Sequence, residues 1–116
     1  MRRGKRGLAD GYIIQVGGHF KIGLAVDVEQ RLATYKTSNA HVYLLKVVAD
    51  GGESLEAHAE QKFERHRLRT SGRGNELYRP HPEIIFWLLW HGAVPRPIPE
   101  FLYRFGIEMI RFMLVG

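Results

Sequence analysis

Residues 11–24 read GYIIQVGGHFKIGL, two short apolar runs on either side of a glycine pair. The branched and aromatic side chains of both runs favour extended backbone, and adjacent glycines between two such runs are typical of a two-residue hairpin turn. The sequence therefore predicts strands over 11–16 and 19–24, joined through Gly17 and Gly18.

The alternation of side chains along this hairpin predicts which residues share a face. Successive side chains of a strand point to opposite faces of the sheet. We therefore expect Tyr12 to share a face with Ile14 on the first strand. On the second strand we expect Phe20 and Ile22 on one face, with Lys21 on the other.

A helix is expected directly after the hairpin, over residues 28–36. Asp27 can cap its first turn, and Gln30 three residues later completes a capping box. The apolar stripe that should face the core follows at helical spacing and consists of Val28, Leu32 and Tyr35.

Apolar runs and turn residues divide the rest of the chain. They predict a strand over 42–49, a turn at 50–52, a helix over 54–69, a basic glycine-rich loop at 70–75, and helices over 83–91 and 101–115. The predicted fold class is α/β of the α+β type, with a small three-stranded antiparallel sheet flanked by helices. We expect a basic flexible arm at 1–10, one domain at 11–91, a proline-rich linker at 92–99 and an extra apolar C-terminal helix within 100–116.

Composition narrows the class of protein and of partner. The chain has 116 residues, of which 45% are hydrophobic and 25% are charged, as in ordinary globular proteins. The absence of cysteine excludes disulfides and thiolate metal sites, and it fits the cytoplasmic location that we expect. The net charge of +5 favours a polyanionic partner. The apolar run at 11–16 is too short for a secretory signal, and the last helix is too short and too charged to span a bilayer.

Arg31 and a row of three glutamates require partners, which spacing alone does not identify. Arg31 borders the apolar stripe of its helix, so it is either an ordinary surface arginine or a cation facing an anion. That anion is either a phosphate or a carboxylate such as Glu56. Glu56, Glu60 and Glu64 are like charges four residues apart. The cation that relieves their repulsion is either a divalent metal on Glu56 or the basic side chains of the same helix.

The histidines do not predict a metal centre. They are spread along the chain, and none shows HxH or HxxxH spacing, so we do not expect a zinc site. The sequence also lacks a glycine-rich nucleotide loop and a nucleophile elbow. Nucleotide-driven and acyl-transfer chemistry are therefore not expected.

The order of four features along the chain is more specific than any one of them. Residues 11–14 (GYII) open the first strand, residues 21–23 (KIG) end the second, and Arg31 and Tyr35 lie four residues apart on the next helix. In this order the chain resembles the GIY-YIG nuclease family.

Two later segments extend the resemblance. Residues 55–56 (LE) precede Phe63 at helical spacing, and residues 75–78 (NELY) are similar to the ending of one small branch of the family. The likeness covers residues 11–85, about two thirds of the chain.

The resemblance implies hydrolysis of phosphodiester bonds, with DNA as the expected substrate and Mg²⁺ or Mn²⁺ as the cofactor. It implies that Glu56 holds the metal, which polarises the scissile phosphate. It further implies that Arg31 stabilises the charge on the phosphoryl oxygens and that Tyr35 helps to orient the phosphate or the water. The group that activates the water is either Tyr12 or Lys21.

Other residues have secondary roles under the same resemblance. The basic side chains expected to contact the nucleic-acid backbone are Lys36, Arg69, Arg73 and Arg79, with dispersed solubilising charge as the alternative. Glu60 either supports the metal ligand or is simply solvated. Glu76 either anchors its loop or reaches the metal or Arg31.

A metal-dependent endonuclease is therefore the leading prediction, and two other functions stay open. Lys21 occupies the tyrosine position of the second motif, which permits a domain that binds nucleic acid without cutting it. The apolar helix from Phe101 to Val115 permits a homodimer, and with it a structural or interaction protein.

Overall fold

The structure is a computed structural model that describes residues 9–38, 41–68 and 77–115, so the loop expected at 70–75 lies outside it. Within these residues one antiparallel sheet has five strands in the order β3-β1-β2-β5-β4. Their bounds are Asp10–Val16 for β1, His19–Ala25 for β2, Val42–Val48 for β3, Arg67–Leu68 for β4 and Leu77–Tyr78 for β5. The prediction of three strands was wrong, because strands of two residues are too short to show alternation.

Four α-helices accompany the sheet in the described part of the chain. They are α1 (Val28–Ser38), α2 (Gly52–Lys62), α3 (Pro82–Trp90) and α4 (Pro99–Val115), with a 3₁₀ turn, η1, at Glu64–His66. The expected helices over 28–36, 83–91 and 101–115 agree with α1, α3 and α4 to within two residues at each end.

Helix α2 ends seven residues before the expected boundary at residue 69. Phe63 leaves the helical path, and its fully buried ring packs edge-on against Tyr78 and Trp87, with ring centroids 6.3 and 5.4 Å away. The following residues pair with β5, where Arg67 lies opposite Tyr78. The helix ends early because these aromatic contacts and strand pairing, made with residues distant in sequence, outweigh local helix propensity.

The hairpin of β1 and β2 forms as predicted. All seven residues of each strand pair, from Asp10 opposite Ala25 to Val16 opposite His19. Gly17 in the turn has a φ of +59°, a conformation that glycine adopts without steric cost. Strand β3 pairs with the other edge of β1, with an irregularity between Ile13 and Ile14.

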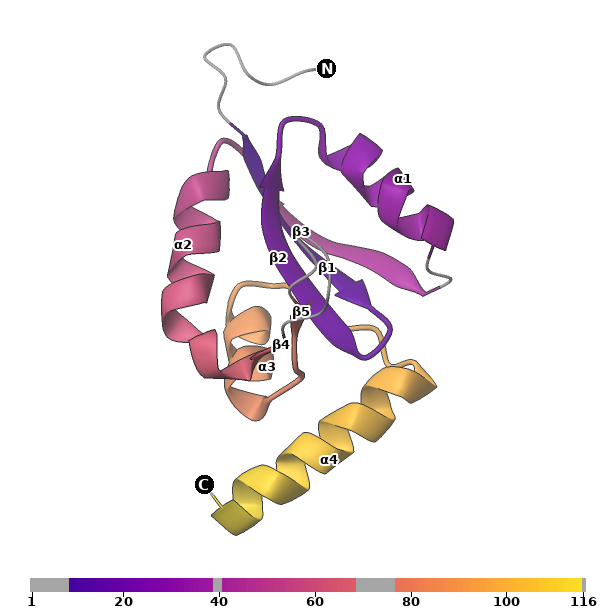
Figure 1. Cartoon of the computed structure of the whole chain (residues 1–116), viewed down its shortest axis with the longest axis vertical. Helices are drawn as coiled ribbons and strands as arrows, with labels where there is room; N and C mark the ends of the chain where they lie inside the picture. The colour runs from indigo at the N-terminus through magenta and orange to yellow at the C-terminus, as the bar shows by residue number, and fades with distance from the viewer. Residues whose placement is uncertain (1–8, 39–40, 69–76, 116) are drawn as a thin grey trace.

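The two faces of the sheet carry separate apolar clusters. Tyr12 and Ile14 pack with Val28 of α1, and Ile13 packs with Ala59 of α2 on the opposite face. Figure 1 shows α1 and α2 on opposite sides of the sheet. The expected alternation along the hairpin is therefore confirmed, and the sheet is covered on both faces.

A buried glutamine attaches the segment after α3 to the hairpin. The side-chain amide of Gln15 donates to the carbonyl oxygens of Gly17 and Arg96 at 3.1 and 3.0 Å. Its Oε1 accepts from the backbone N–H of Arg96 at 2.6 Å. Phe101 at the start of α4 is buried and meets the ring of Phe20 edge-on at 5.9 Å. The base of α4 therefore belongs to the same core as α2 and α3, while the helix runs diagonally away from the sheet (Figure 1).

No described helix has both the length and the apolar character needed to cross a bilayer.

Replacing Phe63 by alanine should strongly destabilise the fold. The variant Phe63→Ala removes a fully buried ring, so we expect the free energy of unfolding to fall by about 3–5 kcal/mol. Chemical denaturation followed by circular dichroism measures this change. The matched control is Phe86→Ala, because the ring of Phe86 on α3 is 71% exposed and its loss should change stability by less than about 0.5 kcal/mol. Equal effects of the two variants would contradict this description of the core.

Candidate functional site

Three of the predicted catalytic residues meet on the α1 face of the sheet. The buried hydroxyl of Tyr12 on β1 lies within hydrogen-bonding reach of Tyr35 and Arg31. Both partners come from α1, one turn apart. The hairpin and the helix that follows it thus bring together side chains that the sequence separates by about twenty residues.

The glycine at the end of the second motif makes room for this arrangement. Gly23 is the cross-strand partner of Tyr12, and a Cβ added to Gly23 would lie 2.8 Å from the tyrosine hydroxyl oxygen. Such an approach is closer than ordinary van der Waals contact allows. Only glycine lets the phenol ring lie over β2 and reach α1.

The environment keeps the Tyr12 hydroxyl protonated. Burial raises the pKa of Tyr12 well above its usual value, and the neighbouring Tyr35 raises it further, while Arg31 opposes both effects. At neutral pH the phenol is therefore a hydrogen-bond donor and not a base.

Arg31 extends from this cluster toward solvent. The Oδ1 atom of Asp27 accepts a hydrogen bond from the backbone N–H of Gln30 at 3.1 Å, which confirms the predicted cap of α1. An open pocket next to this cap is lined by Ala25, Val26, Asp27, Gln30, Arg31 and Thr34. Arg31 is exposed and lines this pocket, so an anionic ligand can reach it from that side.

Lys21 lies on the same face of the hairpin as Tyr12. It is paired with Ile14, which belongs to the α1-side cluster, and its side chain is buried. The two alternatives for the water-activating group are therefore both on the face that Arg31 approaches.

Glu56 belongs to the other layer. It is half-buried in the second turn of α2, the helix that covers the opposite face of the sheet. The start of α2 nevertheless lies against the same end of the hairpin, since a Cβ added to Gly52 would come within 2.5 Å of Leu24. Strand β5 pairs with the outer edge of β2 only at Phe20. From Lys21 to Ala25, no described strand lies along that edge of β2. Arg31 and Glu56 therefore lie on helices that cover opposite faces of the sheet.

The other predicted site residues do not form one surface. Lys36 is exposed in the last turn of α1, and Glu60 is exposed and forms an ion pair with Arg67 at 3.7 Å. Arg79 lies elsewhere, in the pocket described next. Arg69, Arg73 and Glu76 lie outside the described residues.

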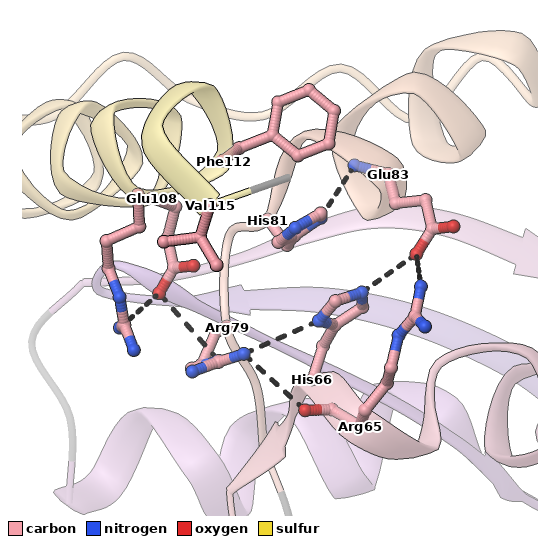
Figure 2. A pocket seen from close by; sticks show the side chains of 9 residues that line it. Arg65, His66, Arg79, His81, Glu83, Glu108, Phe112 and Val115 are labelled. Atoms are coloured by element: carbon pink, nitrogen blue, oxygen red, sulfur yellow. Dashed lines mark hydrogen bonds and ion pairs between the residues drawn. The ribbon is translucent and has the colours of Figure 1, made fainter.

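A second polar pocket lies where η1, the start of α3 and the C-terminal half of α4 approach one another (Figure 2). Its lining consists of Arg65, His66, Arg79, His81, Glu83, Glu108, Arg111, Phe112 and Val115. No sequence motif indicates this pocket, because its members come from three separate segments of the chain. The one local signal was the close spacing of His81 and Glu83, which are two residues apart.

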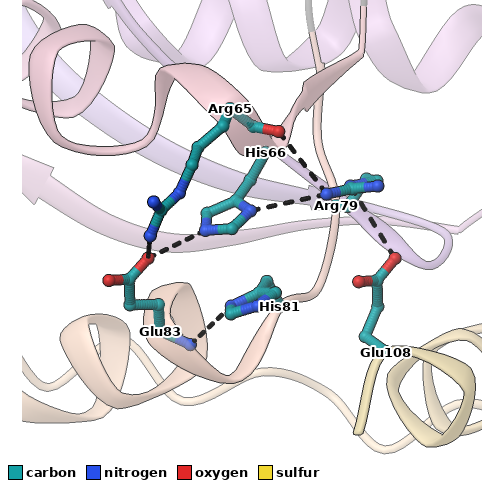
Figure 3. Close-up of polar contacts among 6 residues, drawn as sticks. All are labelled: Arg65, His66, Arg79, His81, Glu83 and Glu108. Carbon is teal, nitrogen blue, oxygen red and sulfur yellow. Dashed lines mark hydrogen bonds and ion pairs between the residues drawn. The ribbon is translucent and has the colours of Figure 1, made fainter. Parts of the chain in front are cut away.

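The two histidines of this pocket have defined hydrogen-bonding roles (Figure 3). Nδ1 of His66 faces an arginine nitrogen of Arg79 at 3.4 Å, so it is an acceptor, and Nε2 donates to Glu83 Oε1 at 2.8 Å. Nδ1 of His81 accepts from the backbone N–H of Glu83 at 3.1 Å, which assigns the ring proton to Nε2. Burial lowers the pKa of His81, as does the neighbouring His66. The ring is therefore neutral at pH 7.

His66, His81 and Glu83 together are a group that could hold a metal ion, since their ligand atoms all lie within 4.8 Å of one another. The sequence shows no metal-ligand spacing that includes both His66 and His81. Pairing of β4 with β5 brings them together, and the backbone N–H of Arg79 donates to the carbonyl oxygen of His66 at 2.9 Å. Spacing along one element cannot reveal a contact that depends on strand pairing.

Comparison with family models, with curated proteins and with solved structures found no match to this chain.

Proposed function

We propose that this chain is a metal-dependent endonuclease that hydrolyses phosphodiester bonds in DNA. The observation that supports the proposal is the convergence of Tyr12, Arg31 and Tyr35 beside an open pocket. A guanidinium group and phenol hydroxyls are donors suited to phosphate oxygens, and the buried environment of Tyr12 holds these donors in a fixed arrangement. The basic net charge of +5 favours the same polyanionic substrate.

In the proposed reaction Arg31 stabilises negative charge on the phosphoryl oxygens, and Tyr35 orients the phosphate or the attacking water. Because Tyr12 keeps its proton, it donates a hydrogen bond and positions the reacting groups. Lys21, on the same face, is then the residue that we propose contacts the water. The sequence left Tyr12 and Lys21 as alternatives for the group that activates the water, and we favour Lys21.

Glu56 is the proposed holder of a divalent cation, Mg²⁺ or Mn²⁺. Hard cations are commonly held by one or two carboxylates together with phosphate oxygens of the substrate and water, which suits a single half-buried glutamate. A cation bound there would supply charge neutralisation for the leaving oxygen. For this, the scissile phosphate must reach both Arg31 and Glu56, which lie on helices of different layers.

The variants Arg31→Ala and Glu56→Gln should lower the rate of DNA cleavage by about 10²–10³-fold, because each removes a group that stabilises charge in the transition state. Cleavage of mixed single- and double-stranded DNA is measured with magnesium or manganese. The matched control is Glu53→Gln, an exposed glutamate in the first turn of α2, which should retain full activity. Unchanged cleavage in both site variants would refute the assignment. Salt-sensitive DNA binding without cleavage in the wild-type protein would favour the non-catalytic alternative instead.

The buried phenol of Tyr12 should make the fold less stable at high pH. Up to about pH 10 the hydroxyl is protonated in both the folded and the unfolded chain. Above that pH only the unfolded chain loses the proton, so the free energy of unfolding falls with rising pH, by at most about 1.4 kcal/mol per pH unit. Tyr12→Phe should show a shallower fall in urea denaturation than the wild type. Tyr103→Phe is the control, since that ring is 69% exposed. Identical slopes in Tyr12→Phe and the wild type would contradict the buried, protonated hydroxyl.

A second function is favoured by the outward face of α4. Glu108 of this helix is buried against the protein, whereas Tyr103, Ile110 and Met113 are exposed. These three residues follow the spacing of a helix–helix seam, and the outward face between them carries no charged side chain. We propose that α4 pairs with α4 of a second copy, because an uncharged, self-complementary face suits a two-fold interface.

The variant Ile110→Glu should convert the dimer to a monomer, because it buries an unpaired charge at the centre of the proposed seam. Sedimentation velocity measures the molar mass in solution. Val47→Glu, a matched change on β3, should leave the dimer intact. A wild-type protein that is monomeric at high concentration would exclude the interface.

A further inference from the structure

The pocket between η1, α3 and α4 contains more positive than negative charge. Three guanidinium groups, of Arg65, Arg79 and Arg111, line it together with only two carboxylates. The two imidazole rings add no charge while their tautomers remain as assigned above. An excess of positively charged side chains in a half-enclosed site attracts an anionic ligand.

The existing ion pairs leave these arginines incompletely satisfied. Arg79 and Arg111 approach the same Glu108 oxygen at 3.7 and 3.8 Å, and Arg65 approaches Glu83 at 3.4 Å. Charge-assisted hydrogen bonds are typically about 2.7–2.9 Å long. The Nε atom of Arg79 is buried and makes no hydrogen bond to any described residue. The donors therefore outnumber the close acceptors.

His81 adds a further donor to the same space. Its Nδ1 atom is occupied by the backbone N–H of Glu83, so the proton on Nε2 is directed away from that bond. Phe112 of α4 packs edge-on against this ring at 5.3 Å and closes one side of the pocket. A less solvated site strengthens hydrogen bonds to a charged ligand.

A metal ion fits this arrangement less well than an anion. The rings of His66 and His81 are stacked, with centroids 3.9 Å apart and planes inclined by only 17°. Imidazole lone pairs lie in the ring plane, so two nearly parallel rings cannot direct them at one ion without reorienting. The three surrounding guanidinium groups would also repel a cation.

We propose that this pocket binds a phosphate group, held by Arg79, Arg111 and the Nε2–H of His81. Phosphate offers several acceptor oxygens in tetrahedral directions, which suits donors that come both from α4 and from the segment between β5 and α3. Figure 2 shows Arg79 and His81 among the side chains of this pocket, and Arg111 lines the same pocket. Glu108 stays as the carboxylate that aligns both arginines. The proposal does not depend on the nuclease assignment, since the pocket includes none of the residues in the Tyr12 cluster.

The test is a titration of the full chain with inorganic phosphate, followed through the histidine ring resonances by NMR. We expect saturable shifts at His81, and about tenfold weaker binding in Arg111→Gln, because one charge-assisted contact is lost. Arg111 is 61% exposed, so its replacement should not unfold the protein, and thermal melting checks this. The matched control is Arg104→Gln on the same helix, whose side chain does not line the pocket and whose loss should leave binding unchanged.

Two further arms identify the source of the phosphate. A short oligonucleotide with a 5′-phosphate is compared with the same oligonucleotide without it, each against wild type and Arg111→Gln. Arg111-dependent binding of both oligonucleotides would indicate a backbone phosphate, and Arg111-dependent binding of only the first would indicate a terminal one. Absence of phosphate-induced shifts at His81, or equal weakening by Arg104→Gln, would overturn the proposal. Saturable shifts with Zn²⁺ but not with phosphate would assign the pocket to a metal instead.

Discussion

The pairing of β1 with β2 is the constraint on which the rest of the structure depends. It puts Tyr12 opposite Gly23, so the phenol ring can lie over the partner strand and reach α1. A slip of one residue would exchange the faces of every side chain on one strand. The α1-side cluster, the core under α2 and the attachment of the base of α4 to Phe20 would then all be lost together.

The C-terminal half of helix α4 is oriented opposite to an ordinary surface helix. Its carboxylate Glu108 faces the protein and lies between Arg79 and Arg111, while its outward side carries exposed apolar residues. This inversion has two consequences on opposite sides of one helix. The inward side completes a polar pocket, and the outward side leaves an apolar surface that a second copy would cover.

Phosphate chemistry is supported in different ways at the two sites. Around Tyr12 the donors are brought together by a buried hydroxyl and a capped helix, so their geometry is constrained before any ligand arrives. In the pocket beside α4 the donors come from three segments, and their ion pairs are long. The first arrangement suits catalysis, in which fixed positions matter, and the second suits binding.

The sequence alone determined the hairpin, the cap of α1 and the ends of three helices, because these features depend on contacts between residues close in the chain. The grouping of Tyr12, Arg31 and Tyr35 was implied by the family resemblance of their motifs and not by residue spacing. Tertiary structure decided where α2 ends, because the buried contacts of Phe63 and the pairing of β4 with β5 join distant residues. It also decided that Glu56 lies on the opposite layer from Arg31 and that His66 meets His81. No periodicity within a single element carries that information.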